Sequence, residues 1–256
     1  MTYQSAAPSD GARTAKVRTY LIYVVLDTSE SMRRPWPEAP QDGGSQAHFV
    51  RLIPRMLREL ADHPVTNKLA SVSVLAFNDE PEILRPMTSL DQPAAIRPPR
   101  LGYGTDYARV LRFLADQHRK DVRAVQQSRM RDGYTVDVAR PWIFFVTDGR
   151  PFARERNQSM DEWMGHRRRL TDEPVGARLA AIGLPGAERD ILWHLATGSE
   201  DGRRNAFIAD RRTNPKELSE SVVDAIKSSI STSASTGLLT IRTPVGMRRI
   251  EGPRHG

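Results

Sequence analysis

The stretch Tyr20-Leu-Ile-Tyr-Val-Val-Leu-Asp-Thr-Ser-Glu-Ser-Met32 joins a strand pattern to a short run of oxygen-bearing side chains. Its seven consecutive apolar or aromatic residues, several of them β-branched, indicate a central strand that is covered on both faces. Asp27, Ser29 and Ser31 follow at the carboxyl end of this strand, where open α/β sheets place their ligand sites. A carboxylate with two hydroxyls suits a hard divalent cation, which takes oxygen ligands and keeps some water. The stretch therefore predicts a metal-binding loop.

Two later stretches also lead into oxygen-bearing side chains. Leu101-Gly-Tyr-Gly-Thr-Asp106 places Thr105 directly before a helical pattern, and its glycines predict that the backbone approaches the metal loop closely. Trp142-Ile-Phe-Phe-Val-Thr-Asp-Gly-Arg-Pro151 is a second central-strand pattern, and Asp148 closes it. We expect Thr105 and Asp148 to join the metal loop in space.

This set of side chains resembles the metal ion-dependent adhesion site (MIDAS) of von Willebrand factor type A (VWA) domains, with all five positions filled in the family's order: Asp27, Ser29, Ser31, Thr105 and Asp148. The resemblance implies that the three hydroxyls coordinate Mg²⁺, or Mn²⁺ or Ca²⁺ in its place, while the two carboxylates act largely through water. The alternative is that the hydroxyls merely cap turns and helices.

The resemblance covers roughly residues 18 to 235 and implies a three-layer, doubly wound α/β fold of the Rossmann-like VWA type. Its sheet is mostly parallel and six-stranded, in the order 3-2-1-4-5-6 with strand 3 antiparallel, and helices cover both faces. The alternation of strand and helix patterns along the chain favours the same class.

The patterns place the expected elements as follows. Strands are expected at residues 20–26, 68–77, 82–84, 140–147, 175–182 and 205–208. Helices are expected around residues 49–60, 106–127, 160–170, 188–196 and 215–230. His118 falls on the inner face of the second helix, where we interpret it as a packed histidine and not as a metal ligand.

The segments outside these elements divide the chain. We expect a disordered leader at residues 1–17, a VWA domain at residues 18–235 and a flexible basic tail at residues 236–256. Within this tail, Leu238 to Ile241 could add one docking strand. The Pro- and Gly-rich loop from Arg33 to Gly44 follows the metal loop, so we expect it to shape partner access. Its Trp36 either contacts the partner or packs over the loop.

Composition excludes several functional classes. Without cysteine the chain has no disulfide, no thiolate zinc site and no thiol nucleophile, which suits a cytoplasmic location. No apolar run approaches the length of about 20 residues that spans a bilayer. The net charge of +7 suggests nucleic acid, but five of the seven charges lie within residues 1–18 and 231–256, and no nucleic-acid motif joins the rest. We therefore expect no nucleic-acid partner.

The function that these features favour is metal-mediated protein recognition without catalysis. The cation would accept an Asp or Glu of a partner protein. The residues around Asp148 and the serine-rich end of the last helix resemble the bacterial tellurium-resistance (TerY-like) branch of the family. This resemblance implies stress signalling with a PP2C-type phosphatase or a Ser/Thr kinase as partner. The alternative is a metal-dependent, phosphatase-like hydrolase at the same site, although Ser29 stands where an aspartyl-phosphate hydrolase carries its second carboxylate.

The last predicted helix, Pro215 to Ile230, leaves two interpretations open. In related domains, closing the metal loop on an acidic ligand can be coupled to a downward shift of this helix, which would make it a reporter of the metal site. Its modest apolar face, flanked by serines, is compatible with several registers. The other interpretation is a fixed helix that covers the sheet.

Overall fold

The computed structural model describes residues 16–35, 40–131, 133–198, 202–210, 214–237 and 240–252. Trp36 and the expected leader up to residue 15 therefore lie outside the described residues. Lys16 and Val17, which we assigned to the leader, belong to the first strand. That boundary was wrong because alternating exposed and half-buried residues precede the fully buried part of the strand, so the apolar run marks only its core.

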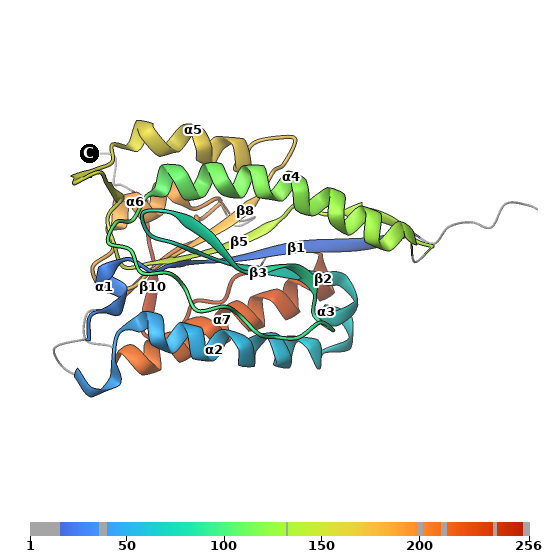
Figure 1. Ribbon diagram of the computed structural model, residues 1–256, viewed down its shortest axis with the longest axis horizontal. Coiled ribbons are helices and arrows are strands. Elements are labelled where there is room, and N and C mark those ends of the chain that lie inside the picture. The colour runs from blue at the N-terminus through green and yellow to red at the C-terminus, as the bar shows by residue number, and fades with distance from the viewer. Residues whose placement is uncertain are drawn as a thin grey trace, which may run out of the picture.

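One mixed sheet forms the middle layer of the molecule (Figure 1). Its strands are β1 (Lys16–Asp27), β2 (Ala70–Phe77), β3 (Pro81–Ser89), β4 (Thr135–Val138), β5 (Trp142–Thr147), β8 (Arg178–Gly183), β9 (Ala206–Ala209) and β10 (Met247–Arg249). The order is β10-β9-β8-β5-β1-β2-β3, and β4 pairs with the first residues of β1. The expected order 3-2-1-4-5-6 is confirmed as β3-β2-β1-β5-β8-β9, with β3 antiparallel to β2.

Within the described residues the sheet has eight strands, where we expected six. The two additions, β4 and β10, are four and three residues long, which is too short to give a periodic signal. The third strand, expected at residues 82–84, is also longer than expected and includes Pro86. This proline lies in an irregularity of an edge strand, between the pairs Val74↔Arg85 and Val72↔Thr88, where proline is tolerated.

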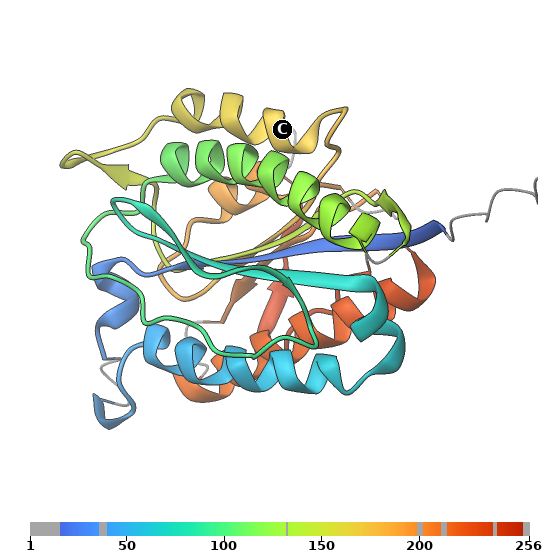
Figure 2. The same ribbon diagram turned by 45° about the vertical axis from the view of Figure 1, so that its right-hand side comes forward.

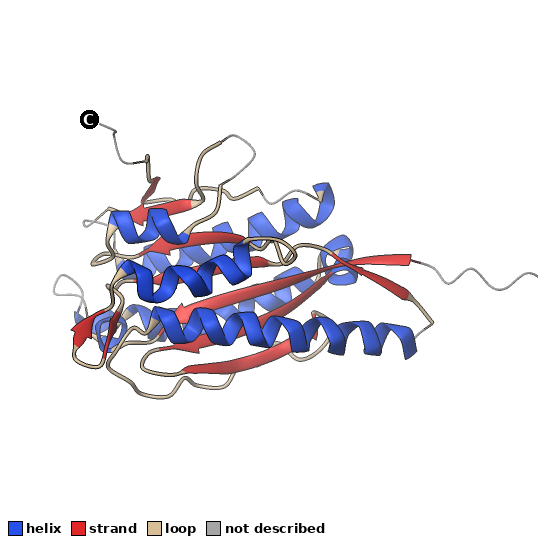
Figure 3. Cartoon of the chain, turned by 90° about the horizontal axis from the view of Figure 1, so that it is seen from above, coloured by secondary structure: helices blue, strands red, loops and turns tan. Residues whose placement is uncertain are grey.

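Helices cover both faces of the sheet, as Figures 1 and 2 show. They are α1 (Glu30–Arg33), α2 (Ser45–Ala61), α3 (Pro64–Leu69), α4 (Tyr107–Arg131), α5 (Met160–Thr171), α6 (Arg189–Leu195) and α7 (Pro215–Thr236). Helices α2, α3 and α7 lie on one face, and α4, α5 and α6 on the other (Figure 1). The view from above in Figure 3 shows the long α4 running beside the strands. Among the described residues, no helix is long and apolar enough to cross a membrane.

The central strand β1 supplies both halves of the core. Ile22, Val24 and Leu26 belong to the cluster under α2 and α7, whereas Tyr23 and Val25 belong to the cluster under α4 and α5. Successive side chains of a strand point to opposite faces, so an unbroken apolar run is what a strand between two helix layers requires. Burial on both sides fixes the register of β1 and thereby the position of the polar residues that follow it.

The C-terminal segment does not behave as a free tail. Helix α7 continues to Thr236 and ends at Gly237, whose φ of 77° is the left-handed conformation that closes helices. Residues 240–246 then run back along α7, because its buried serines accept backbone N–H groups: Ser233 from Thr240 over 3.0 Å and Ser229 from Arg242 over 3.2 Å.

The docking strand also lies elsewhere than expected. Of residues 238–241, the first two are outside the described residues, and Thr240 and Ile241 are not in a strand. The strand is β10, which pairs antiparallel with β9. Serine side chains and a three-residue edge strand hold this segment, and neither gives a hydrophobic pattern in the sequence.

Candidate metal centre

The candidate metal centre lies at the carboxyl edge of the sheet, where β1 and β5 run side by side in parallel. The register pairs Leu26 with Val146, which sets Asp27 beside Thr147 and places Asp148 one residue further along the neighbouring strand. The chain that leaves β1 crosses one face of the sheet, and the chain that leaves β5 crosses the other. Doubly wound folds bind their ligands at the point where the two connections diverge.

Asp27 is fully buried, and both of its carboxylate oxygens are occupied. Oδ1 accepts the backbone N–H of Ser29 over 2.9 Å, which forms the turn that follows the strand. Oδ2 accepts the hydroxyl of Thr147, the last residue of β5, over 2.6 Å. The carboxylate is therefore fixed in orientation by groups from both central strands.

Ser29, Ser31 and Asp148 form a chain of contacts across the two loops. The hydroxyl oxygens of the two serines lie 3.1 Å apart, and Ser31 donates to Asp148 Oδ1 over 2.7 Å. Ser29 is buried while Ser31 is exposed, so the row of oxygens leads from the protein interior to the surface.

Thr105 is held in place by the strand β6 (Phe152–Ala153), which forms a small hairpin with β7 (Arg156–Asn157) after the Asp148 loop. Thr105 and Phe152 exchange two backbone hydrogen bonds, of 2.8 and 3.0 Å. A Cβ placed on Gly149 would lie 3.1 Å from Thr105 Oγ1 and 3.6 Å from Asp27 Oδ2. The absence of a side chain there leaves a space that both oxygens face.

The two glycines before Thr105 make a different close approach from the one we expected. A Cβ on Gly102 would lie 2.2 Å from Cγ of Asn78, and one on Gly104 would lie 2.3 Å from Oδ1 of Asp79. The backbone thus packs against the turn between β2 and β3 and not directly against the metal loop. The Asp79 carboxylate accepts the N–H groups of Tyr103 and Gly104 over 2.8 and 2.9 Å, which holds the segment that carries Thr105.

The electrostatics of the centre favour a cation. Burial raises the pKa of Asp27, and the hydrogen bonds from Ser29 and Thr147 offset part of that rise. Burial and the nearby charge of Asp27 both raise the pKa of Asp148. Neither carboxylate forms an ion pair with a described residue. The charge of Arg34 lowers the pKa of Asp148 only in part. Two adjacent acids without an ion pair are stabilised when a divalent cation binds beside them.

The donor set also fits the chemistry of such a cation. All five side chains offer oxygen, the ligand type that Mg²⁺, Mn²⁺ and Ca²⁺ prefer. Within the part of the chain that the structure describes, no group of three or more His, Cys, Asp or Glu side chains is placed to hold a metal. A cation at this edge would therefore depend on the three hydroxyls as well as on the two acids.

The structure brings all five predicted residues together, and it adds residues that the sequence did not single out. Thr147 and Asp79 position the centre without belonging to the predicted set. Thr147 could have been suspected, because a threonine at the end of a buried strand needs a hydrogen-bond partner. His118 is buried away from the centre, with Nδ1 3.3 Å from the hydroxyl of Tyr23, as its position on the inner helix face predicts.

No family model matches the chain, and no curated protein matches it. The structure is similar to a von Willebrand factor type A protein from Catenulispora acidiphila, at 12% identity over 83% of this chain and 43% of that one, with a TM-score of 0.50. It is also similar to proximal thread matrix protein 1 of the mussel byssus with a zinc-occupied MIDAS motif, at 17% identity over 83% and 49%, with a TM-score of 0.50. The PilB minor pilin of Streptococcus sanguinis matches at 11% identity over 89% and 64%, with a TM-score of 0.53.

The chain therefore has the fold of von Willebrand factor type A domains, as its motifs led us to expect. It spans 43% to 64% of the length of the three proteins above. At these identities the likeness defines the fold, and what the site binds has to be argued from its own residues.

Proposed function

We propose that this chain is a divalent-metal-dependent protein-interaction module that recognises an acidic side chain of a partner. One observation carries the proposal: five oxygen-bearing side chains from three separate loops converge at one sheet edge, and neither of their two carboxylates forms an ion pair with a described residue. The zinc-occupied MIDAS of the structurally similar mussel protein agrees with it.

Each residue has a distinct part in this proposal. Ser29, Ser31 and Thr105 would hold the cation, and Asp27 and Asp148 would supply negative charge beside it, largely through water. Mg²⁺ is the expected ion, with Mn²⁺ or Ca²⁺ as substitutes. Because the hydroxyls are neutral, the bound cation stays only partly neutralised and accepts a further carboxylate at its open side. The exposed Ser31 marks that side.

We further propose that the centre is not catalytic. Asp27 is a poor nucleophile, because it is fully buried and both of its oxygens already accept hydrogen bonds. The described hydrogen bonds of the Ser29 and Ser31 side chains lead to each other and to Asp148, and none leads to a histidine that could act as a base. A metal-dependent hydrolase remains the competing function.

The finer assignment rests on the sequence resemblance alone. It supports a role in bacterial stress signalling of the TerY-like, tellurium-resistance type, and the absence of cysteine suits a cytoplasmic location. The partner would be a protein with an exposed Asp or Glu, such as a PP2C-type phosphatase or a Ser/Thr kinase.

The test combines metal binding with an unbiased selection of peptides. Calorimetry should show one Mg²⁺ site, lost in Asp148→Ala and kept in Asp62→Ala, which removes an exposed acid at the far end of α2. A displayed peptide library selected on the protein in Mg²⁺ should yield Asp- or Glu-containing peptides that EDTA releases. Peptides without acidic residues, or binding that survives EDTA, would refute the interaction module. Mg²⁺-dependent turnover of phosphomonoesters that Asp27→Ala abolishes would establish the hydrolase instead.

A further inference from the structure

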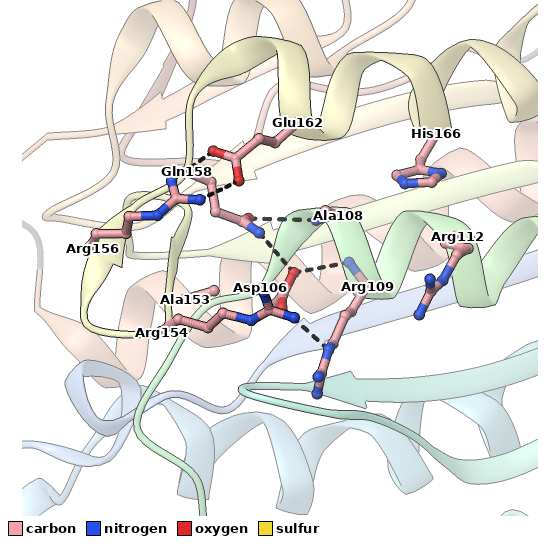
Figure 4. A pocket seen from close by; sticks show the side chains of 10 residues that line it. All are labelled: Asp106, Ala108, Arg109, Arg112, Ala153, Arg154, Arg156, Gln158, Glu162 and His166. Atoms are coloured by element: carbon pink, nitrogen blue, oxygen red, sulfur yellow. Dashed lines mark hydrogen bonds and ion pairs between the residues drawn. The ribbon is translucent and has the colours of Figure 1, made fainter.

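A pocket of about 290 Å³ lies beside the candidate metal centre and plays no part in the function proposed above. It is enclosed by the first turns of α4, by the β6–β7 hairpin and by α5. Figure 4 shows His166 and Arg112 at one end of it and Arg154 and Arg156 at the other, with Arg109 between them. We call it the arginine pocket.

Two of the four arginines have acidic partners. Arg156 makes a two-pronged ion pair with Glu162, over 2.8 and 2.7 Å. Arg109 pairs with Glu80 and, over 3.5 Å, with Asp106. These pairs account for the acids that line the pocket, so they hold its walls together.

The other two arginines, Arg112 and Arg154, are exposed and form no ion pair with a described residue. Each guanidinium presents several N–H donors in a planar fork that matches carboxylate and phosphate oxygens. Nδ1 of His166 is buried and has no hydrogen-bond partner in the described structure. Burial, and after it the charges of Arg169 and Arg112, lower the pKa of His166, and the charges of Asp116 and Asp106 oppose this shift.

The turn that carries Arg154 has an unusual backbone. Arg154 and Glu155 have φ angles of 53° and 63°, and they join β6 to β7 as a two-residue turn with positive φ at both positions. Such turns favour Gly, Asn or Asp, because other residues pay a steric cost in this conformation. Residues held in strained conformations cluster at functional sites, and here the strained turn places a guanidinium in the lining of the pocket.

The arginine pocket and the metal centre share two backbone segments. Asp106, which lines the pocket, directly follows Thr105 of the metal centre. Phe152, which begins the hairpin, exchanges backbone hydrogen bonds with Thr105 and precedes Ala153, which lines the pocket. A single extended segment of a partner can therefore reach both places.

We propose that the arginine pocket binds an oxyanion, the carboxylate or phosphate of a second side chain on the partner segment whose acidic residue meets the metal. Arg112, Arg154 and His166 are the residues that would contact it. The volume is at the lower limit for small-molecule sites, which fits one anionic head group better than a nucleotide. The identity of the partner rests on the proposed function, whereas anion binding at the pocket does not require the metal.

The experiment follows the His166 ring and the arginine Nε–H groups by NMR in ¹⁵N-labelled protein with EDTA present. Inorganic phosphate and succinate are titrated separately at constant ionic strength. We expect a saturable shift of His166 and Arg112. A response to phosphate alone assigns a phosphate site, and a response to both assigns a general oxyanion site. No saturable response to either overturns the proposal.

The variants separate binding from folding. Arg112→Gln and Arg154→Gln should each weaken anion binding about tenfold, as expected for one charged hydrogen-bonding partner. Arg123→Gln, an exposed arginine farther along α4, should leave binding unchanged. Arg154→Gly removes the guanidinium but suits the positive φ, so it should raise stability while it still loses anion binding. Equal binding in Arg154→Gly would overturn the role of Arg154.

Mg²⁺ calorimetry on the same variants keeps the two proposals apart. Arg112→Gln should bind Mg²⁺ as the unchanged protein does. If Mg²⁺ fails to bind while phosphate still shifts His166, the metal centre is wrong and the arginine pocket stands. If Mg²⁺ binds and neither anion shifts His166, the pocket proposal fails alone.

Discussion

Thr147 donates its hydroxyl to Oδ2 of Asp27 over 2.6 Å, although the two residues are 120 positions apart in the chain. The hydrogen bond joins the ends of the two central strands and leaves Asp27 a single orientation, because Oδ1 is held by the turn at Ser29. A carboxylate placed this firmly needs little rearrangement to serve a bound cation.

We therefore expect Thr147→Val to weaken Mg²⁺ binding about tenfold or more, the usual effect of losing a group that orients a metal ligand. Valine keeps the shape and the strand preference of threonine but cannot donate to Asp27. Calorimetry at pH 7 measures the effect, and Thr135→Val, at an exposed position of β4, is the control. Unchanged affinity in Thr147→Val would show that the orientation of Asp27 does not matter.

A second prediction separates metal affinity from stability. Asp148→Asn removes the repulsion between two adjacent carboxyl groups, so in EDTA the free energy of unfolding should rise by about 1 kcal/mol. Mg²⁺ should stabilise the unchanged protein by mass action and the variant hardly at all. Urea unfolding with EDTA and with Mg²⁺ gives all four values. Equal stabilisation of both proteins by Mg²⁺ would remove Asp148 from the centre.

A third prediction concerns the close packing of Gly102 against Asn78. The Asn78 side chain cannot move aside easily, because it is buried and donates to Thr28 Oγ1 and to the carbonyl of Arg100. Gly102→Ala should therefore cost about 2 kcal/mol of stability, a typical overpacking penalty, and should weaken Mg²⁺ binding by displacing Thr105.

The matched control is Gly165→Ala in the middle of α5, where a Cβ would meet nothing within 4 Å. The free energy of unfolding of that variant should rise by about 0.5–1 kcal/mol, because alanine has a higher helix propensity than glycine. Thermal unfolding of both variants provides the comparison. If Gly102→Ala left the stability unchanged, the turn between β2 and β3 would have to move aside for the added Cβ.

A fourth prediction is acid destabilisation through His118, whose pKa burial lowers to about 4. Because the folded protein resists protonation of this ring, the unfolded state binds more protons as the pH falls from about 6.5 to 4, and stability falls over that window. Between pH 7 and pH 5 the loss from this group should be about 2 kcal/mol.

Urea unfolding of the unchanged protein and of His118→Gln at both pH values measures this contribution, which should be absent from the variant. Asp121, on the same helix, acts in the opposite direction, because burial raises its pKa; Tyr23, which hydrogen-bonds to Asp121, stays neutral over this range. An identical fall in stability in both proteins would assign the acid sensitivity to other groups.

A fifth prediction decides between the two interpretations of the last helix. Asn214 caps the start of α7, Gly237 closes its end, and Lys227 pairs with Glu59 of α2. These contacts favour a fixed helix, so hydrogen exchange across residues 215–236 should be the same with Mg²⁺ alone and with Mg²⁺ plus an acidic peptide from the selection described above. Altered protection on adding the peptide would establish the coupled shift instead.

The sequence predicts the parts of this molecule in which local pattern and burial agree. The run from Tyr20 to Leu26 is apolar because both faces of β1 are covered, so it marks the sheet centre without ambiguity. The site residues are visible for the same reason, since Asp27 and Asp148 interrupt two such runs at their ends. The strand order followed from resemblance, and the structure agrees with it.

Other features depend on contacts that no local pattern encodes. Arg154 and Glu155 give no sign of a positive-φ turn, because the usual Gly or Asn is missing. The Asp79 carboxylate holds the segment before Thr105 by accepting hydrogen bonds from backbone N–H groups that lie 24 and 25 residues further along the chain. Such features appear only when the tertiary structure is known.

The short strand β10 has a consequence for self-association. Without it, β9 would end the sheet with a row of unpaired backbone N–H and C=O groups, the template on which foreign strands add and fibrils grow. Strand β10 forms hydrogen bonds with part of that row of backbone groups. It is itself only three residues long and carries Arg248 and Arg249, so the edge that it forms is short and charged. Strand β10 thus protects this edge of the sheet from edge-to-edge growth, and a version without it would be prone to aggregate even with an intact metal centre.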